Sequence, residues 1–438
     1  MSVKIAVIGG GSTYTPELVD GFARFTDRLP VGELVLHDID AARLEPVAGV
    51  AGRILARQGW TGRLTATGSL EQAVEGADFV VVQLRVGGQQ ARLLDETLPL
   101  EVGCVGQETT GAGGFAKALR TVPVVLDLAE QVAARAADGA WLVDFTNPVG
   151  IVTQALMDAG HRAIGLCNVA IGLQRKFAGL LQVDPGRVAL EHVGLNHLTW
   201  ERAVTVDGRD VLPDLLDGHL DALSAHLELP GSLLRDLSAV PSRYLRFYYR
   251  TAGMLDEQRA GRIRAREVQA IEEELLALYR DPALDTKPAA LARRGGTHYS
   301  TAAVQLIASL YDDRGDVQVV NIRNDGAVPD LPDDAVVEIP ARITSAGAAA
   351  LPARPLPPEL LGLVQQVKSY ERLAVAAART GDHRSAVLAL MANPLVRDRE
   401  PAVALLDAFL REHERTLPGF WRAPSRTRSG HESVSTPS

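Results

Sequence analysis

The first 17 residues constrain the fold of this chain more than any other segment. An apolar, β-branched run at residues 3–8 stops at three consecutive glycines and leads into residues that start helices. Thr15 can cap a helix, Pro16 suits the first helical turn, and Glu17 complements the positive end of the helix dipole. The segment therefore predicts a strand, a loop whose backbone N–H groups can cradle a phosphate, and a helix. The loop residues expected to contact the bound group are Gly9, Gly10, Gly11, Ser12 and Thr13.

The next apolar run supports a dinucleotide as the bound group. It ends at Asp38, 27 residues after Gly11, where a carboxylate could accept hydrogen bonds from an adenosine ribose. An acidic residue at this position favours NAD over NADP. The glycine fingerprint is incomplete, because Tyr14 replaces its third glycine. A plain tight turn is the alternative, and the alternation of strands and helices that follows disfavours it.

This alternation continues through the first 168 residues. Strand patterns cover residues 77–85, 140–148 and 163–168, and helical patterns lie at 117–137 and from about 150. Such an order predicts a parallel, doubly wound sheet, in which ligands bind beyond the carboxyl ends of the strands. The polar residues at those ends are Gly9, Asp38, Arg85, Asn147, Cys167 and Asn168. We expect them to line one crevice.

The second half of the chain has a mixed pattern. Shorter strand candidates occur at 188–195, 201–208, 317–324 and 335–343, with long helices near 257–279 and 357–415. We therefore expect an α/β protein with a Rossmann-type dinucleotide-binding domain at residues 1–166 and an α+β domain at 167–421. The polar, Ser- and Pro-rich stretch 422–438 is expected to be disordered.

Composition narrows the class of protein without naming it. The chain has 438 residues, 46% of them hydrophobic, and a formal charge of −9, which argues against a general nucleic-acid or anionic-membrane surface. It holds two cysteines, too few for a disulfide framework, and its start does not resemble a signal peptide. No apolar stretch approaches the roughly 18–20 residues that span a bilayer. We expect a cytoplasmic protein with no membrane or nucleic-acid partner.

Two short motifs, Cys167-Asn168 and Asn196-His197, each end an apolar run and could hold one metal ion beside the dinucleotide. A thiolate and an imidazole are common metal ligands. Taken singly, a cysteine on an apolar strand is more often a small core residue, and a lone histidine is more often hydrogen-bonded than metal-bound. We assign Asn196 a structural role.

In combination, the motifs resemble one family, the NAD- and metal-dependent glycosidases of glycoside hydrolase family four, and in particular its 6-phospho-β-glucosidase branch. The resemblance covers nearly all of residues 1–420 and rests on short sequence motifs that occur in the correct order. They include GGGSTYTPEL, QLRVGG, ARLLDETLPL, GQETTGAGG, DFTNPVG, GLCNVAIG, GLNH, YLRFYY and RRGGTHYS.

The resemblance implies a fold like that of lactate and malate dehydrogenases and a redox-neutral hydrolysis of 6-phospho-β-glucosides. In that scheme NAD oxidises carbon 3 of the sugar, a base removes the proton from carbon 2, the aglycone is eliminated, water adds, and the cofactor returns its hydride. It also implies that Cys167 and His197 bind a divalent metal, most often Mn²⁺, although these ligands would accept other metals.

The remaining site residues also follow from the resemblance. Tyr244 matches the catalytic base, with Tyr248 as the alternative. Phosphate recognition is expected from Arg92, Asn147 and Arg294. Asn168 marks the β branch, because the α branch looks like Cys-Asp at this step, and we expect the amide to position sugar hydroxyls.

Two other functions remain open: an NAD-dependent hydroxy-acid dehydrogenase of the lactate/malate type, and a sugar-phosphate sensor without catalysis. For the glycosidase, the expected partner is a small molecule, a phosphorylated β-glycoside. Related folds suggest a homodimer or homotetramer.

Overall fold

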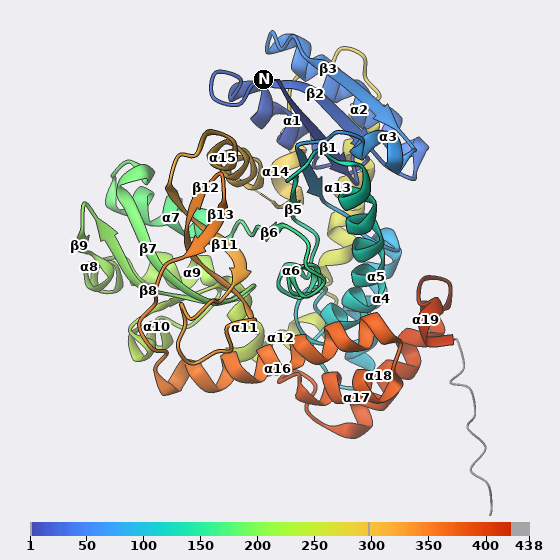
Figure 1. Cartoon of the computed structure of the whole chain (residues 1–438). Coiled ribbons are helices and arrows are strands. Elements are labelled where there is room, and N and C mark those ends of the chain that lie inside the picture. The colour runs from blue at the N-terminus through green and yellow to red at the C-terminus, as the bar shows by residue number, and fades with distance from the viewer. Residues whose placement is uncertain (1, 297, 422–438) are drawn as a thin grey trace, which may run out of the picture.

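The computed structural model describes residues 2–296 and 298–421 and has a parallel sheet in its N-terminal half (Figure 1). The strand order is β3-β2-β1-β4-β5-β6, which is the doubly wound order predicted from the sequence. Strands β1 and β4 lie at the centre and are almost completely buried, which explains their uninterrupted apolar runs. The strands are β1 (Val3–Ile8), β2 (Val31–His37), β3 (Arg63–Thr67), β4 (Phe79–Val82), β5 (Trp141–Asp144) and β6 (Ala163–Gly165).

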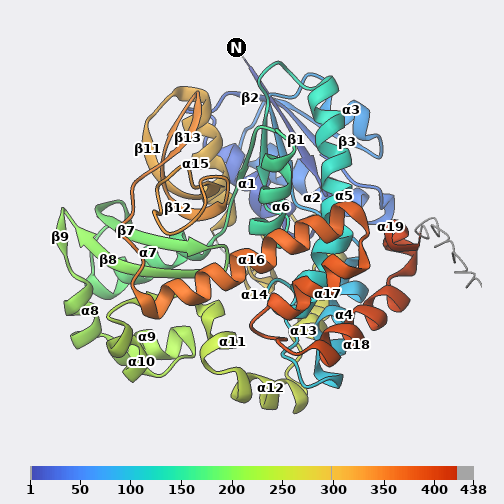
Figure 2. The ribbon, with the colours of Figure 1, turned by 60° about the horizontal axis from the view of Figure 1, so that its bottom comes forward.

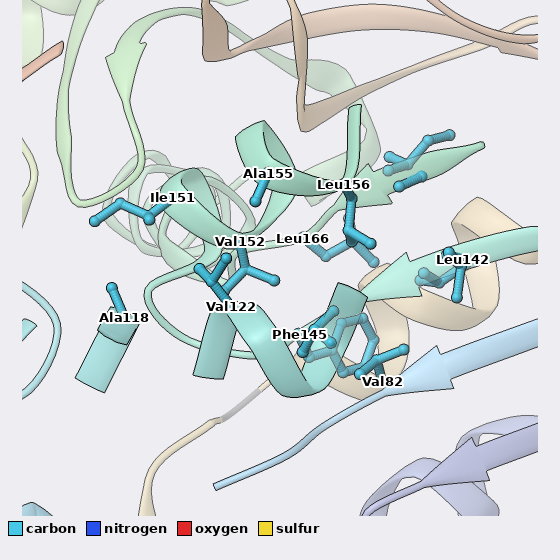
Figure 3. Close-up of a cluster of buried hydrophobic side chains, with 14 of the residues drawn as sticks. Val82, Ala118, Val122, Leu142, Phe145, Ile151, Val152, Ala155, Leu156 and Leu166 are labelled. Atoms are coloured by element: carbon cyan, nitrogen blue, oxygen red, sulfur yellow. The ribbon is translucent and has the colours of Figure 1, made fainter. Parts of the chain in front are cut away.

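Helices follow each of these strands. Pro16 lies in the first turn of α1, as expected, and Asp40 caps α2 by accepting a hydrogen bond from the Arg43 N–H. Figure 3 shows apolar side chains of α5 and α6 meeting others near the ends of β4 and β5, among them Val122, Val152 and Phe145. The helices are α1 (Thr15–Arg24), α2 (Ala41–Arg57), α3 (Leu70–Val74), α4 (Gly88–Glu101), α5 (Gly111–Arg135), α6 (Val149–Asp158) and α7 (Val169–Leu181).

The strands of the second half extend the same sheet in antiparallel fashion, in the order β6-β11-β12-β7-β8-β10. The connection is narrow: β11 meets β6 through the pair Asn321↔Gly165, and β12 meets β7 through Glu338↔Gly194. The strands are β7 (Val188–Leu195), β8 (Leu198–Val206), β9 (Arg209–Asp210), β10 (Val240–Pro241), β11 (Asp316–Arg323), β12 (Val336–Thr344) and β13 (Gly347–Ala350). The four predicted strands thus exist, with boundaries shifted by up to three residues.

Two predicted helices were too long. The helix expected at 257–279 is divided into α12 and α13 by a turn in which Gly261 has φ +101°. The helix expected at 357–415 is divided into α16, α17 and α18, because Gly381 ends α16 with φ +68° and the Asn393-Pro394 step ends α17. These five helices are α12 (Thr251–Arg259), α13 (Arg264–Tyr279), α16 (Pro358–Thr380), α17 (His383–Ala392) and α18 (Arg399–Glu412).

The other elements of the second half are short, apart from α15. They are η1 (Pro185–Arg187), α8 (Leu212–Gly218), α9 (Leu220–Leu227), α10 (Gly231–Leu237), η2 (Arg243–Leu245), α11 (Arg246–Tyr249), α14 (Ala290–Arg294), α15 (Tyr299–Asp312), η3 (Glu414–Thr416) and α19 (Pro418–Trp421).

Helix α16 holds the two halves together. It packs against α5 and α6 of the first half and reaches β7 of the second, crossing the molecule in Figure 2. A large apolar core includes residues of both halves, from Ile5 in β1 to Phe409 in α18. The α/β class with a parallel N-terminal sheet is therefore confirmed, while the boundary at residue 166 stays a prediction. The predicted disordered tail, 422–438, lies outside the described residues.

Candidate active site

A cavity of about 1580 Å³ lies beyond the carboxyl ends of the parallel strands. Its wall brings together most of the residues that the sequence predicted as site residues, namely Gly9, Ser12, Asp38, Arg92, Asn147, Asn168, Tyr244 and Arg294. Cys167 and His197 are buried, with relative exposures of 4% and 2%, and are not among the described residues of the wall. The predicted crevice therefore exists, and the Cys167 thiol and the His197 imidazole lie behind its surface.

The glycine loop turns sharply at the end of β1. The N–H groups of Gly9 and Gly10 both donate to the carbonyl of His37, at 2.9 and 2.7 Å. Gly9 has φ +86°, and a Cβ there would lie 2.6 Å from the carbonyl oxygen of Gln83. A side chain at this position would therefore be strained and would collide with backbone.

Asp38 faces this loop from the end of β2. Its Oδ2 accepts the Gly11 N–H at 2.9 Å, and its Oδ1 accepts the Asp40 N–H at 3.0 Å. A Cβ at Gly11 would lie 2.7 Å from Oδ2, so only glycine fits at this position beside the carboxylate. Each oxygen retains a lone pair, which suits a ribose hydroxyl.

Tyr14, which replaces the third glycine, anchors the loop to the second half of the chain. Its hydroxyl accepts the Ser300 N–H at 2.9 Å, and its ring meets that of Tyr299 edge-on with centroids 6.1 Å apart. The side chain is 6% exposed. The departure from the fingerprint is thus explained by packing against α15.

Cys167, His197 and Tyr244 form a compact group. His197 lies in the turn between β7 and β8 with φ +64°, and the Tyr244 ring stacks on its imidazole with centroids 3.6 Å apart. The Nδ1 atom of His197 is 3.0 Å from Thr109 Oγ1. The thiol of Cys167, just beyond β6, is within hydrogen-bonding reach of Asn196 and Tyr299.

Burial dominates the protonation of this group. It lowers the pKa of His197 to about 4, so the imidazole is neutral near pH 7. Burial raises the pKa of the Cys167 thiol well above its usual range, and the nearby Glu338 carboxylate adds to the rise. The pKa of Tyr244 is also raised, by burial and by the charges of Cys167 and Glu108. A bound cation would favour the thiolate and the phenolate over their neutral forms.

A network of ion pairs, which we call the cavity ion network, lies beside this group. Glu108 pairs with Arg85, with Arg92 at 3.3 Å and with Lys117 at 2.8 Å, and Arg92 also pairs with Glu96 at 2.8 Å. Burial alone would raise the pKa of Glu108, but these three cations hold it well below its usual range. The carboxylate is therefore ionised.

A second group of ion pairs, centred on Glu272, lies beside the glycine loop. The Nε atom of Arg294 donates to Thr13 Oγ1 at 2.7 Å, and its Nη2 lies 3.1 Å from Glu272, which also pairs with Arg43 at 3.0 Å. Burial lowers the pKa of Arg294, and the cations of Arg85 and Arg92 lower it further, while Glu272 opposes them. We count both groups as the cavity ion network, whose described members are five cations and three carboxylates: Arg43, Arg85, Arg92, Lys117 and Arg294 with Glu96, Glu108 and Glu272. Its formal excess of positive charge suits an anionic ligand.

Asn147 contributes an unsatisfied polar atom to the cavity. Its Oδ1 is buried and has no hydrogen-bond partner among the described residues. Buried polar atoms normally have a partner, so a ligand hydroxyl is the expected one. Asn168 also lies in the wall, at the start of α7. Tyr248, the alternative base, is not among the described wall residues, and burial beside Glu371 raises the pKa of its hydroxyl.

Sequence reasoning missed the carboxylates that organise the site. Glu108 and Glu272 received no role, although GQETTGAGG was recognised as a motif. Glu108 pairs with cations from α4, α5 and the loop before α4, and Glu272 pairs with Arg43 of α2, so no spacing within one element could have identified them. Asn196, expected to be structural, touches both Cys167 and Glu338.

Among residues 2–296 and 298–421, no three His, Cys, Asp or Glu side chains are grouped to hold a metal ion. Within the same ranges no helix is both long and apolar enough to cross a membrane.

Two family models match most of the chain. The sequence profile described as "Family 4 glycosyl hydrolase" matches residues 4–183, and "Family 4 glycosyl hydrolase C-terminal domain" matches residues 192–396. The chain therefore belongs to family 4 of the glycosyl hydrolases and is a glycosidase.

Its relatives include phosphoglycosidases. The "Probable 6-phospho-beta-glucosidase" of Bacillus subtilis is 42% identical over 96% of this chain and 98% of its own length. The 6-phospho-β-glucosidase of Thermotoga maritima, solved with NAD and glucose-6-phosphate, superposes with a TM-score of 0.90 at 35% identity, covering 95% of this chain and 99% of that one. The same protein was also solved with manganese, NAD⁺ and glucose-6-phosphate, with a TM-score of 0.87 at 35% identity over 94% and 99% of the two chains.

The expected dehydrogenase-like fold is also confirmed. Malate dehydrogenase from Plasmodium falciparum superposes with a TM-score of 0.53 at 15% identity, over 86% of this chain and 98% of that one. At this identity the likeness concerns the fold alone.

Proposed function

We propose that the protein hydrolyses 6-phospho-β-glucosides with NAD and a divalent metal, Mn²⁺, as cofactors. The observation that carries the proposal is the single cavity that joins the glycine loop and Asp38 to Tyr244 and to the cavity ion network. The Bacillus subtilis and Thermotoga maritima relatives supply the substrate class and both cofactors. The proposal therefore rests on one site that can hold the substrate, NAD and the metal together.

The glycine loop and Asp38 fit NAD. Gly9 lets the backbone approach a pyrophosphate closely, and the Asp38 oxygens can accept the ribose hydroxyls. When bound, the nicotinamide would accept a hydride from carbon 3 of the sugar and later return it. Ser12 and Thr13 complete the loop, and Arg294 donates hydrogen bonds to both of their hydroxyl groups.

Cys167 and His197 fit a metal ion that is completed by substrate oxygens. The imidazole of His197 is neutral, and its Nδ1 already lies within hydrogen-bonding distance of Thr109. This leaves Nε2 as its ligand atom. A divalent cation there would polarise the carbon-3 ketone and stabilise the enediolate that follows. Its charge would also lower the pKa of both Cys167 and Tyr244, which burial raises.

In the proposed scheme the reaction is redox-neutral: oxidation at carbon 3, proton abstraction at carbon 2, elimination of the aglycone, addition of water and re-reduction. Tyr244 removes the carbon-2 proton, and its stacking on His197 keeps the phenol beside the metal ligands. Asn168 orients sugar hydroxyls, since an amide cannot act as a general acid. The leaving oxygen is then protonated by water.

Arg92, Asn147 and Arg294 are proposed to bind the 6-phosphate. The cavity ion network carries a formal charge of +2 from five cations and three carboxylates, which matches a phosphate dianion. Glu108 and Glu272 hold the arginines in place before the substrate arrives.

The test is hydrolysis of p-nitrophenyl β-glucoside 6-phosphate with NAD⁺ and Mn²⁺ both present and with each omitted. The proposal expects turnover that requires both and a much slower reaction with the non-phosphorylated glycoside. Net accumulation of NADH from a hydroxy acid would instead indicate a dehydrogenase. Binding of the sugar phosphate without turnover would indicate a sensor.

We also propose a cytoplasmic location and a homodimer or homotetramer. The two cysteines are free, and a reducing compartment would preserve the Cys167 thiol as a metal ligand.

A further inference from the structure

The metal-ligand candidates lie next to the narrow seam of the sheet. Strand β11 meets β6 through Asn321↔Gly165, two residues before Cys167. Strand β12 meets β7 through Glu338↔Gly194, three residues before His197. The hairpin of β11 and β12 therefore sets how far apart β6 and β7 lie, and these strands lead into Cys167 and His197.

Asn321 and Glu338 also face each other across this hairpin. The Asn321 Nδ2 donates to Glu338 Oε2 at 3.0 Å, and both side chains are almost completely buried. A Cβ added to Gly165 would lie 2.9 Å from the Cβ of Asn321, so the glycine allows this close approach. Asn321 and Glu338, which make the two strand pairings of the seam, are thus also joined to each other through their side chains.

The same oxygen of Glu338 reaches the candidate metal site. It accepts a hydrogen bond from Asn196 Nδ2 at 2.7 Å, and the Asn196 side chain is within hydrogen-bonding reach of the Cys167 sulfur. Asn196 is the residue before His197. A continuous chain of contacts therefore runs from Asn321 through Glu338 and Asn196 to Cys167.

The second oxygen of Glu338 belongs to a buried charged group. Glu338 Oε1 lies 3.0 Å from Nε2 of His192, whose Nδ1 lies 2.7 Å from Glu201 Oε1. Burial would lower the pKa of His192, but the two carboxylates raise it to about 10. Two carboxylates around one imidazolium leave a formal charge of −1. A buried group of this kind is costly and does little for stability, which suggests another role.

We propose that Glu338 and Asn321 are positioning residues for the divalent metal: they fix the spacing of the segments that hold Cys167 and His197, and Glu338 holds the Asn196 side chain beside the Cys167 sulfur. This inference rests on the proposed function, because it takes Cys167 and His197 as the ligands. Residues that hydrogen-bond to metal ligands commonly change metal affinity by about 10- to 100-fold when they are mutated.

The test measures Mn²⁺ and NAD⁺ affinity separately, without substrate. Purified Glu338→Gln is titrated with Mn²⁺, free ion being followed by electron paramagnetic resonance, and with NAD⁺ by calorimetry. Glu191→Gln is the matched control, since Glu191 lies on β7 in surface ion pairs with Arg202 and Arg354. The expected result is a Kd for Mn²⁺ weakened by about 10- to 100-fold with an unchanged Kd for NAD⁺, the control matching the wild type in both.

Excess metal gives a second readout. If Glu338 positions the metal, saturating Mn²⁺ should restore the kcat of Glu338→Gln, because the ligands themselves remain. Should Glu338→Gln fail to fold, Asn321→Ala is measured in the same way and should weaken Mn²⁺ binding with NAD⁺ binding intact.

The outcomes separate this inference from the function on which it rests. Wild-type Mn²⁺ affinity in the folded variant overturns the inference and leaves the proposed function untouched. A wild-type protein that binds no Mn²⁺ overturns the metal site itself, and the inference with it.

Discussion

The ring of Tyr244 lies face to face with the imidazole of His197, with centroids 3.6 Å apart and planes inclined by 12°. The proposed base and one proposed metal ligand are therefore a single packed unit, although they are 47 residues apart in the sequence. Because the phenol is buried, its pKa is raised, and a cation bound at His197 would lower it.

Tyr244→Phe should keep this stack while it removes the hydroxyl. We expect kcat to fall by about 100- to 10,000-fold, as for loss of a general base, with little change in thermal stability. Steady-state kinetics on p-nitrophenyl β-glucoside 6-phosphate measure the effect. Tyr248→Phe is the matched control and should stay close to the wild-type rate; a larger loss there would move the base to Tyr248.

Gly9→Ala tests the cofactor loop. With φ at +86° and the Gln83 carbonyl 2.6 Å from the added Cβ, the substitution should cost at least about 1–2 kcal/mol of stability and weaken NAD⁺ binding. Urea denaturation and calorimetry measure the two effects. Gly179→Ala, in an exposed part of α7 where a Cβ meets nothing within 4 Å, should leave NAD⁺ binding unchanged. Equal affinities in all three proteins would contradict the loop assignment.

Asp144 should make the stability of the protein fall as the pH rises. Burial raises the pKa of this carboxyl from 3.8 to about 8, although hydrogen bonds from Thr146 and Thr153 oppose the rise. Between these values the folded protein keeps a proton that the unfolded chain releases, so the contribution is fully present below pH 3.8 and is lost as pH rises toward 8.

Asp144→Asn removes this titration. Between about pH 5 and pH 7, the wild type should lose about 2–3 kcal/mol of unfolding free energy relative to the variant. Urea denaturation of both proteins at the two pH values measures the difference. Parallel pH dependences would show that Asp144 is ionised in the folded state.

Arg294 and Arg92 should differ in what they bind. Arg294 contacts Thr13 in the cofactor loop, whereas Arg92 pairs with Glu96 and Glu108. Arg294→Lys should therefore weaken NAD⁺ binding and raise the KM for the phosphorylated substrate, and Arg92→Lys should raise the KM alone. A lost hydrogen bond to a charged group is worth about 1.5–3 kcal/mol, or about 10- to 100-fold in KM. Equal KM changes for a non-phosphorylated glycoside would contradict the phosphate assignment.

The N-terminal half was predictable because its signals are local. The glycine loop, Asp38 and the polar strand ends each follow from residues close in sequence, and the parallel strand order places them at one edge. Tyr14 shows the limit of that reasoning, since the reason for it lies at Ser300 and Tyr299.

The predicted helices failed where the pattern of apolar residues continued through a break. The apolar pattern around 357–415 continues past Gly381, so it did not indicate that the positive φ of this residue ends α16. The groups that organise the site could not be predicted for a different reason. Glu108 binds cations from three separate segments, and Glu338 pairs with Gly194 only because the sheet brings them together.

The central claim is that a proton leaves carbon 2 of the sugar during hydrolysis. The most direct measurement is the release of glucose 6-phosphate from p-nitrophenyl β-glucoside 6-phosphate in deuterated water, with NAD⁺ and Mn²⁺ present and the product examined by nuclear magnetic resonance. The account predicts deuterium at carbon 2 and no net NADH. Product that carries hydrogen alone at carbon 2, formed equally well without NAD⁺ and Mn²⁺, would contradict it.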